Sequence, residues 1–388
     1  MKTVYLDHNA TTPVDPLVVE AMLPYLSAKF GNASSVHSFG REAKVALENA
    51  REQIAAVINC DPTELYFTSG GTESDNIAIL GTAFKNIKEK DHIIVGAAEH
   101  HAVLEPAEYL AHRHNLKLDF LPVDREGFSS PDQLRQIVKD RTSIVSVMHA
   151  NNETGTIQDI RPMAEVAHEK GSLFHTDAVQ STGKIPVDVR QMDVDMASIT
   201  AHKIYGPKGI GALYIRAGIK VLPLFYGGSH ERKRRPGTEN VAGAVGFAKA
   251  LEIALARQQQ DYKMMSDLAD YFIDKVVATI PDIALNGTRQ NRVPQTVNIS
   301  FNGVEGESIV LALDLKGIAC SSGSACTSGA TEPSHVLRAM GIESVMAQGA
   351  IRFSIGRSTT RDEIDYVLGV LPDVIGKLRE MSPVYSKQ

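Results

Sequence analysis

Short runs of apolar residues alternate with longer amphipathic stretches up to about residue 215. The short runs are rich in β-branched residues and predict strands at 65–68, 92–95, 117–121, 143–148, 172–175 and 196–199. In the longer stretches, apolar residues recur every three or four positions, which predicts helices at 40–59, 71–84, 103–114 and 162–169. This alternation predicts an α/β fold: a mostly parallel sheet with helices on both faces.

The pattern changes beyond residue 240. A long helical stretch at 241–276 is followed by predicted strands at 296–301 and 350–355 and by helices at 307–315 and 362–379. A length of 388 residues also favours two domains. We therefore expect a large domain at 15–258 and a smaller α/β domain formed by 1–14 and 259–388.

Composition narrows the class of protein. The formal net charge of −6 argues against a nucleic-acid partner, which calls for a basic face. Three cysteines are too few for a disulfide framework, and their spacing holds no pair of metal ligands, so we predict no metal site. No apolar run approaches the roughly 18 residues of a membrane span, and no leader is apparent. We expect a soluble cytoplasmic protein.

Polar residues gather where the predicted strands end. These groups are Ser69–Glu73, Glu99–His101, His149–Gly155, Asp177 with Gln180, and Thr200–Lys203. Taken singly, each group is a turn or a helix cap. Because ligands of open α/β sheets bind at the carboxyl ends of the strands, five such groups with one lysine indicate a binding site.

The residue types in these groups are those of a pyridoxal phosphate site. Lys203, before a glycine-rich turn at 205–211, supplies an amine for a Schiff base. The turn at 69–72 leads into a helix whose first N–H groups can hold phosphate. His100 can stack on a pyridine ring and move protons, and Asp177 can keep the ring nitrogen protonated.

Two further candidate site residues, Cys326 and Arg352, lie in the C-terminal part of the chain. Cys326 lies in a run of small residues at 321–329, which we expect to be exposed and mobile, and nearby cations or helix dipoles could lower its thiol pKa. The alternative is an exposed thiol without a role. Cys320 is predicted to be structural, and Cys60 is predicted to be chemically inert.

Arg352 is a charged residue within an apolar strand, so its guanidinium should meet a carboxylate of the protein or of a substrate.

Motifs along nearly the whole chain together resemble those of one enzyme family. They are Tyr5–Asp7, Ala10–Pro13, Gly31–His37, Thr68–Ser74, His202–Gly209, Arg235–Thr238, Ser321–Gly329 and Ile351–Ser354. The chain resembles the cysteine desulfurases, a branch of the fold-type I pyridoxal phosphate enzymes, and its loop at 321–329 is similar to that of their first class. The tail at 378–383 most resembles the NifS-like, nitrogen-fixation branch. His8, where relatives often have asparagine or tyrosine, and Gly71, where many have alanine, depart from the pattern.

The resemblance implies a fold-type I architecture with a seven-stranded sheet, and it implies roles for individual residues. The catalytic residues would be Cys326, Lys203 and His100. Residues that would bind the cofactor are Gly71, Thr72, His100, Asn152, Asp177, Gln180, Thr200, His202, Lys203 and Thr238. Asn152 and Arg352 would bind the substrate carboxylate.

The implied activity is the removal of sulfur from L-cysteine, which yields L-alanine and a persulfide on Cys326. The sulfur would serve iron–sulfur cluster assembly through a scaffold or another acceptor protein, with Cys326 as the transient sulfur-transfer contact. The implied assembly is a homodimer in which Thr238 reaches the phosphate of the neighbouring subunit.

Other functions stay open from the residues. A selenocysteine lyase or a small aminotransferase would use the same cofactor without needing the thiol. A non-catalytic sulfur or iron–sulfur carrier would need cysteine pairs that the sequence lacks. A nucleotide site is disfavoured because neither glycine-rich phosphate-binding motif occurs in the required place.

Overall fold

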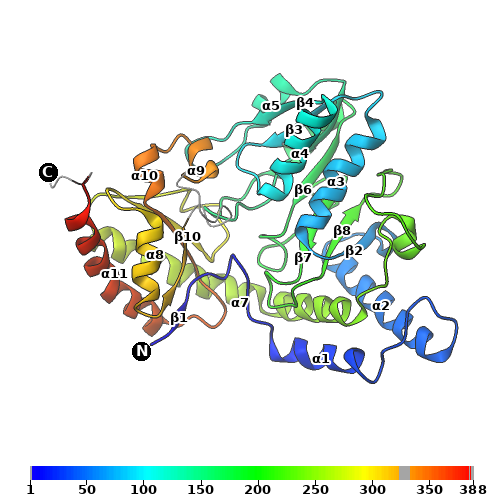
Figure 1. Ribbon diagram of the computed structural model, residues 1–388, viewed down its shortest axis with the longest axis horizontal. Helices are drawn as coiled ribbons and strands as arrows, with labels where there is room; N and C mark the ends of the chain where they lie inside the picture. The colour runs from blue at the N-terminus through cyan, green and yellow to red at the C-terminus, as the bar shows by residue number, and fades with distance from the viewer. Residues whose placement is uncertain (1, 323–332, 384, 386–388) are drawn as a thin grey trace.

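The computed structural model describes residues 2–322, 333–383 and 385. Its larger part contains a seven-stranded sheet in the order β2-β8-β7-β6-β5-β3-β4 (Figure 1). The strands are β2 (Leu65–Thr68), β3 (His92–Gly96), β4 (Lys117–Leu121), β5 (Thr142–Ser146), β6 (Leu173–Asp177), β7 (Met196–Thr200) and β8 (Gly211–Ile215). Within this sheet β8 runs antiparallel to both its neighbours and the remaining strands run in one direction. The predicted mostly parallel sheet is confirmed.

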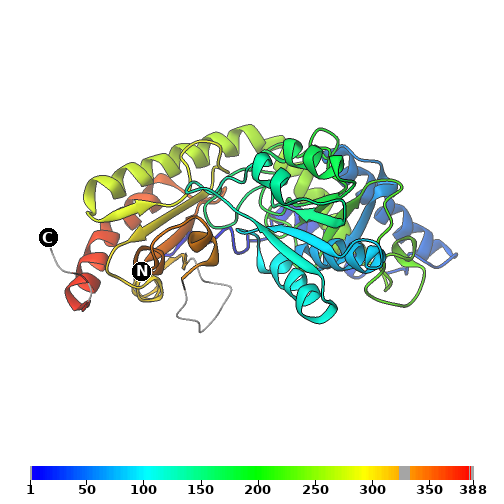
Figure 2. The ribbon, with the colours of Figure 1, turned by 90° about the horizontal axis from the view of Figure 1, so that it is seen from above.

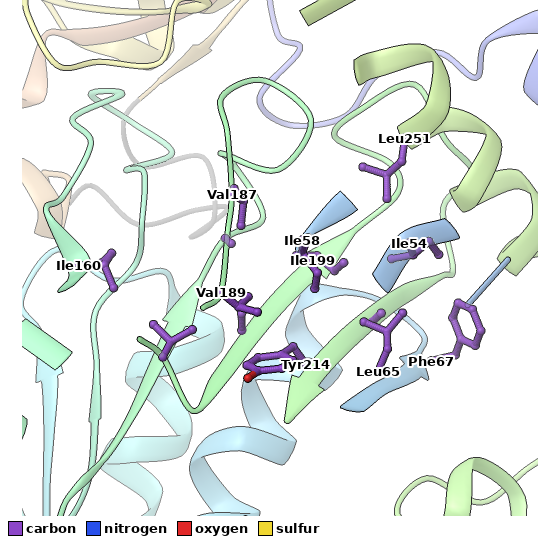
Figure 3. Close-up of a cluster of buried hydrophobic side chains, with 14 of the residues drawn as sticks. Ile54, Ile58, Leu65, Phe67, Ile160, Val187, Val189, Ile199, Tyr214 and Leu251 are labelled. Carbon is purple, nitrogen blue, oxygen red and sulfur yellow. The ribbon is translucent and has the colours of Figure 1, made fainter. Parts of the chain in front are cut away.

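Helices cover both faces of this sheet. Leu65 and Phe67 face a core formed with α2 (Ser38–Val57), α6 (Ile160–Glu169) and the first half of α7 (Val241–Thr279), as Figure 3 shows in part. Tyr66 faces the opposite core, formed with α3 (Gly71–Asn86) and α4 (His101–His114). Because successive side chains of a strand alternate between faces, a sheet buried on both sides needs apolar residues at every position. This is why segments such as Leu65–Phe67 and Ile93–Val95 are continuous apolar runs.

The smaller part has its own sheet and core. Its strands follow the order β12-β13-β10-β9, namely β9 (Ile283–Leu285), β10 (Thr296–Phe301), β12 (Ser321–Ser322) and β13 (Ala350–Ser354). Helices α8 (Gly306–Asp314) and α11 (Arg361–Met381) pack on it. Strand β1 (Val4–Tyr5) pairs with β11 (Ile318–Ala319) of this part.

The 39-residue helix α7 connects the two parts. Phe247 and Leu251 lie in the core of the large sheet, whereas Phe272 and Ile273 lie in the core of the small one. Figure 2 shows α7 running along both lobes. The boundary near residue 258 stays a prediction. Among the residues described, neither α7 nor any other helix has the long apolar stretch that crossing a membrane requires.

Several elements were not predicted, and many of the predicted boundaries differ from the observed ones by one to three residues. The strand expected at 143–148 ends at Ser146, and the one expected at 172–175 continues to Asp177. Helix α1 (Pro16–Leu26) begins at a clear Asp15 cap, but its apolar side chains are distributed around the helix and give no helical period. The remaining unpredicted elements are β1, β8, β9, β11, β12, α5 (Pro131–Ile137), α9 (His335–Ala339), α10 (Ser344–Gln348) and the 3₁₀ turns Pro62–Glu64 and His230–Lys233.

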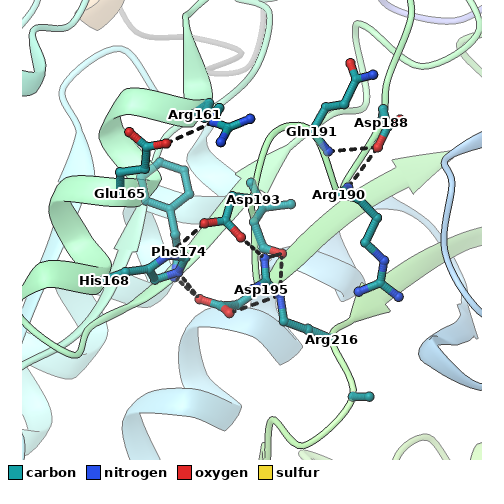
Figure 4. A network of polar contacts seen from close by, with 12 residues as sticks. Arg161, Glu165, His168, Phe174, Asp188, Arg190, Gln191, Asp193, Asp195 and Arg216 are labelled. Atoms are coloured by element: carbon teal, nitrogen blue, oxygen red, sulfur yellow. Dashed lines mark hydrogen bonds and ion pairs between the residues drawn. The ribbon is translucent and has the colours of Figure 1, made fainter.

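A charged network closes the amino ends of the parallel strands (Figure 4). Asp195, directly before β7, accepts from His168 Nε2 at 2.8 Å and from the Phe174 backbone at 2.8 Å. Arg216, directly after the reversed strand β8, pairs with Asp193 and Asp195. The hydrogen bond to Asp195 raises the pKa of His168. These charged groups pair with one another at the edge of the sheet opposite the carboxyl ends of the strands, so their role is structural.

Candidate active site

A cavity of about 330 Å³ opens at the carboxyl ends of the parallel strands. Ten of the predicted site residues line it: Gly71, Thr72, His100, Asn152, Asp177, Gln180, Thr200, His202, Lys203 and Arg352. Five more were missed by the sequence reasoning: Asn9, Ala10, Asp75, Met148 and Val179. Asp75 lies two residues after Glu73 in the same predicted helix, and the sequence pattern did not show which of the two faces the cavity; Glu73 pairs with Arg235 instead. No sequence signal pointed to Asn9 and Ala10, because they belong to the N-terminal segment, which is far from the other cavity residues along the chain.

Lys203 lies where the two parts meet. Its Nζ donates to the backbone carbonyls of Asn9 at 2.5 Å and Ala10 at 2.7 Å. The next segment of the chain is also fixed, because Thr12 Oγ1 donates to the His202 carbonyl at 2.9 Å and accepts from the Tyr205 N–H at 2.8 Å. The N-terminal segment therefore holds the lysine amine at the cavity wall.

The start of α3 offers a place for an anion. Gly70 caps this 16-residue helix without a side-chain hydrogen bond, so the first N–H groups are not satisfied by a cap. A Cβ on Gly71 would lie 2.8 Å from Val179 Cγ2, so an alanine at this position would require the Val179 side chain to shift. Burial, followed by the charge of Lys203, lowers the pKa of His202 to about 4, so His202 is a neutral hydrogen-bonding group here.

Two buried carboxyl groups lie under the cavity. Burial raises the pKa of Asp177 to about 6, although its Oδ1 accepts from the Val179 N–H at 2.8 Å. Burial and then the neighbouring Asp177 raise the pKa of Asp75, whose Oδ1 has no hydrogen-bond partner among the described residues. A buried acid of this kind is stabilised in its charged form by a cation, so the pair fits a protonated ring nitrogen.

His100 forms the cap of α4. Its Nδ1 accepts from the Ala102 N–H at 3.1 Å, which places the proton of the neutral ring on Nε2. Burial, followed by the charge of Lys203, lowers the pKa of His100 to about 4. His100 is therefore neutral above that pH and suited to lie against an aromatic ring.

Arg352 lies in the middle of β13 and is buried, as its sequence context predicted. Its Nη2 pairs with Asp7 Oδ1 at 3.0 Å, and its Nη1 donates to the Asn152 carbonyl at 3.1 Å. Its Nε has no partner among the described residues. The guanidinium thus meets one carboxylate of the protein and still has donor capacity at the cavity.

Both ends of the segment that carries Cys326 are anchored beside this cavity. Ser321 pairs with Arg352 across the strands β12 and β13. On the other side, Ser334 Oγ donates to Glu153 Oε2 at 2.6 Å, and His335 Nε2 lies 2.8 Å from the carbonyl of Glu99, the residue before His100. Cys326 itself lies outside the described residues.

The two other cysteines are unsuited to reaction. Burial raises the thiol pKa of Cys60 and of Cys320 to about 12. Cys320 packs in the core of the smaller part, as predicted. Across the described ranges, no three His, Cys, Asp or Glu side chains are grouped so that they could hold a metal ion.

Thr238 does not line the cavity. It lies in a separate hollow of about 850 Å³, which shares Thr72 with the cavity and is also lined by Phe225 and Tyr226. Tyr226 is 89% exposed, an unusual value for so large an apolar ring. Thr238 is therefore not among the residues that line the cofactor cavity of its own chain.

Taken together, the cavity residues fit pyridoxal phosphate. The Lys203 amine and the buried Asp177 carboxyl group line the cavity, and the N-terminus of α3, which begins at Gly71, lies at one end of it. These are the groups that bind an aldehyde, a pyridinium nitrogen and a phosphate.

Comparison with known proteins agrees with this assignment. Residues 4–367 match the model of the family described as Aminotransferase class-V. The chain is 51% identical to "Cysteine desulfurase IscS" of Dictyoglomus turgidum over 98% of this chain and 97% of that protein. It is 47% identical to the protein of the same name from Methanosarcina thermophila, over 100% and 95% of the two chains.

Solved structures show the same likeness. One described as a NifS-like protein superimposes with a TM-score of 0.91 at 38% identity, over 97% of this chain and 100% of that one. Another, described as SspA in complex with cysteine, superimposes with a TM-score of 0.81 at 34% identity, over 91% and 99%.

Proposed function

This chain belongs to the aminotransferase class-V family and, within it, to the cysteine desulfurases, and from that premise we propose how its residues release sulfur from L-cysteine. The observation that supports the proposal is the gathering of ten predicted residues around one cavity, with Lys203 at its wall. When bound, pyridoxal phosphate supplies an aldehyde and an electron-withdrawing ring that stabilises negative charge on the α-carbon of the substrate.

The protein supplies the remaining functions. Lys203 holds the aldehyde end of the cofactor and then moves the α-proton at its Nζ, which the carbonyls of Asn9 and Ala10 orient. Asp177 keeps the ring nitrogen protonated, because its buried carboxylate gains most from a cationic partner. Gly71 with the start of α3, and Thr72, Thr200 and His202, hold the phosphate.

Cys326 is the proposed sulfur acceptor. Its thiolate attacks the sulfur of the bound cysteine, and a sulfur–sulfur bond forms while the carbon–sulfur bond breaks. The electron pair of the broken bond goes to the substrate carbon, which takes up a proton and leaves as L-alanine. The persulfide remains on Cys326. The anchoring of both flanking segments at Arg352, Glu153 and Glu99 supports this role.

Replacement of Cys326 by alanine tests this function. We expect the variant to keep the visible absorption of the cofactor but to lose alanine release from L-cysteine, because no nucleophile would remain for the sulfur. Cys320→Ala is the matched control, since it removes another thiol of the same part of the molecule and should stay active. Equal alanine release by Cys326→Ala and the wild type would favour a lyase or an aminotransferase instead.

Arg352 is the proposed clamp for the substrate carboxylate. We expect Arg352→Ala to raise the KM for cysteine by roughly 10- to 100-fold, with a smaller change in kcat, because a charge-assisted contact to the substrate is lost. The exposed Arg361→Ala is a suitable control. Steady-state kinetics decide the matter, and an unchanged KM would place the substrate carboxylate elsewhere.

A homodimer is the proposed assembly. Thr238 lies outside the cofactor cavity, and the neighbouring Tyr226 is highly exposed, which suits a surface that a second copy covers. In that assembly Thr238 would reach the phosphate bound by the partner. Sedimentation equilibrium tests the assembly, and a monomer at working concentrations would contradict it.

The proposed cellular role follows from the persulfide. Sulfur held on Cys326 would pass to an iron–sulfur scaffold or another acceptor protein in the cytoplasm. The low cysteine content agrees with a reducing compartment.

A further inference from the structure

A second, smaller cavity lies behind Lys203. It holds about 30 Å³ and is lined by Lys203, Lys184, His8, Gln258 and Gln295, among others. Three of its polar atoms have no hydrogen-bond partner among the described residues: His8 Nδ1, Gln258 Nε2 and Gln295 Oε1. A space of this size and polarity has room for one or two water molecules, so it can solvate an amine at its wall.

That amine is Lys184. The turn before it brings the backbone close to its neighbours, since Gly183 has a φ of +76° and a Cβ there would lie 3.0 Å from Ile204 and 3.2 Å from Ala254. The Lys184 side chain then returns along the turn, and its Nζ donates to Gln180 Oε1 at 2.9 Å. Within the described ranges Lys184 forms no ion pair with a carboxylate. Its hydrogen-bond partner is an amide that lines the cofactor cavity.

The Gln180 amide is held from both sides. It is 4% exposed, and its Nε2 donates to the Asn9 carbonyl at 3.1 Å, the same carbonyl that accepts from Lys203 Nζ. A carbonyl only accepts hydrogen bonds, so the Asn9 carbonyl requires the nitrogen of the Gln180 amide on its side. The Lys184 amine donates to the Gln180 oxygen that this orientation turns toward it, whereas a flipped amide would place oxygen against the Asn9 oxygen and give up this bond.

This orientation matters for the cofactor cavity. The Gln180 nitrogen carries a second proton beyond the one given to Asn9, and Gln180 lines the 330 Å³ cavity whereas Lys184 does not. When pyridoxal phosphate is bound as proposed above, the Gln180 nitrogen would offer that proton to the ring oxygen of the cofactor. Such a donor would lower the negative charge on the oxygen and with it the proton affinity of the neighbouring Lys203 Nζ.

We propose that Lys184 is a positioning residue that fixes the Gln180 amide with its N–H groups toward the cofactor and thereby lowers the proton affinity of Lys203 Nζ. The inference rests on the proposed placement of pyridoxal phosphate. It concerns a residue that acts through Gln180 without touching the cofactor.

Other titratable groups face this arrangement. On the cofactor side they are His100, His202, Asp75, Asp177 and Arg352, and around the small cavity they are His8, Tyr205, Asp261 and Tyr262. Arg357 on that side is already paired with Asp15 and Asp261. Burial, followed by the charges of Lys203 and Arg352, lowers the pKa of Lys184. Among the described residues, none of these groups hydrogen-bonds to the Gln180 amide, so they contribute equally to the wild type and to a Lys184 variant.

The experiment is a pH titration of the visible cofactor band in the holoenzyme. Lys184→Met keeps the length of the side chain and removes the donor. We expect the pH midpoint of the band to rise by roughly one unit and the dissociation constant of pyridoxal phosphate to increase about tenfold, as one oriented hydrogen bond is lost. Lys184→Arg keeps a donor and should titrate close to the wild type. Gln258→Leu, which changes the same small cavity without contacting Gln180, is the matched control and should leave the midpoint unchanged.

The outcomes separate this inference from the proposed function. A folded Lys184→Met protein with the midpoint of the wild type would overturn the inference alone. A shift of equal size in Gln258→Leu would also overturn it, because the small cavity rather than the amide would then be responsible. A wild type without any visible band would overturn the cofactor placement itself. Should Lys184→Met not fold, Gln180→Glu, which accepts from Lys184 but has no N–H to offer, must raise the midpoint; an unchanged midpoint there refutes the inference.

Discussion

Replacement of Lys203 by alanine is expected to abolish the visible absorption band of bound pyridoxal phosphate and to lower alanine release by roughly a thousandfold or more. The amine would be lost both as the attachment point of the cofactor and as the group that moves the α-proton, and each role alone contributes strongly to catalysis. The Nζ sits between the carbonyls of Asn9 and Ala10 at the cavity wall, and among the described residues no other lysine lines that cavity. Absorption spectra and alanine assays of the purified variant measure both effects.

Lys208→Ala is the matched control for this prediction. Lys208 belongs to the same glycine-rich turn but is exposed and does not line the cavity. This control should keep both the band and the turnover. Retention of both by Lys203→Ala would refute the assignment of the cofactor lysine.

Replacement of Asp177 by asparagine is expected to have the second largest effect, a loss of about 100-fold or more in kcat. Asparagine can still accept the Val179 N–H at 2.8 Å, so the turn is retained, but a neutral amide does not keep the ring nitrogen protonated. Without that charge the ring is a weaker electron sink. Pre-steady-state measurement of α-proton removal would show the slow step directly, and an unchanged rate would assign the pyridine partner to another acid.

The same substitution should stabilise the cofactor-free protein above pH 6. The pKa of Asp177 is raised from 3.8 to about 6, so the folded state holds a proton that the unfolded state releases. Ionising the buried group costs the wild type folding free energy, and this cost grows between pH 4 and pH 6 and is fully present above pH 6. The Asp177→Asn variant would carry no such cost.

Thermal melts of the two cofactor-free proteins measure this effect. The variant should melt higher at pH 7.5, and its advantage should disappear as the pH falls toward 4, where both proteins are uncharged at this position. A pH-independent difference would attribute the gain to packing rather than to the buried charge.

Much of the fold was predictable because the pattern of apolar residues in the sequence reflects which faces of a strand or helix are buried. A strand covered on both faces must be apolar at every position, as in Ile93–Val95, and a helix packed on one side must repeat its apolar residues, as in α2. Short elements such as β11, β12 and α9 show no recognisable apolar pattern, because two to five residues are too few to define a period.

The sequence by itself determined six of the seven strands of the large sheet, the long helices and the chemistry placed at the strand ends. Lys203, Asp177, His100 and Thr200 follow predicted strands within five residues, and parallel strands bring their carboxyl ends to one edge without further information. It also determined that Arg352 must meet a carboxylate, since a guanidinium within an apolar strand requires a partner.

Only the tertiary structure decided which residues complete the site. The partner of Arg352 is Asp7, which β1 and its neighbouring turn bring alongside β13 from the other end of the chain. The same N-terminal segment delivers the Asn9 carbonyl to both Lys203 and Gln180, and the turn at Gly183 places Lys184 behind that amide. Hydrophobic periodicity records whether a residue is buried but not which distant residue it meets, and these contacts depend on how the small sheet packs against the large one.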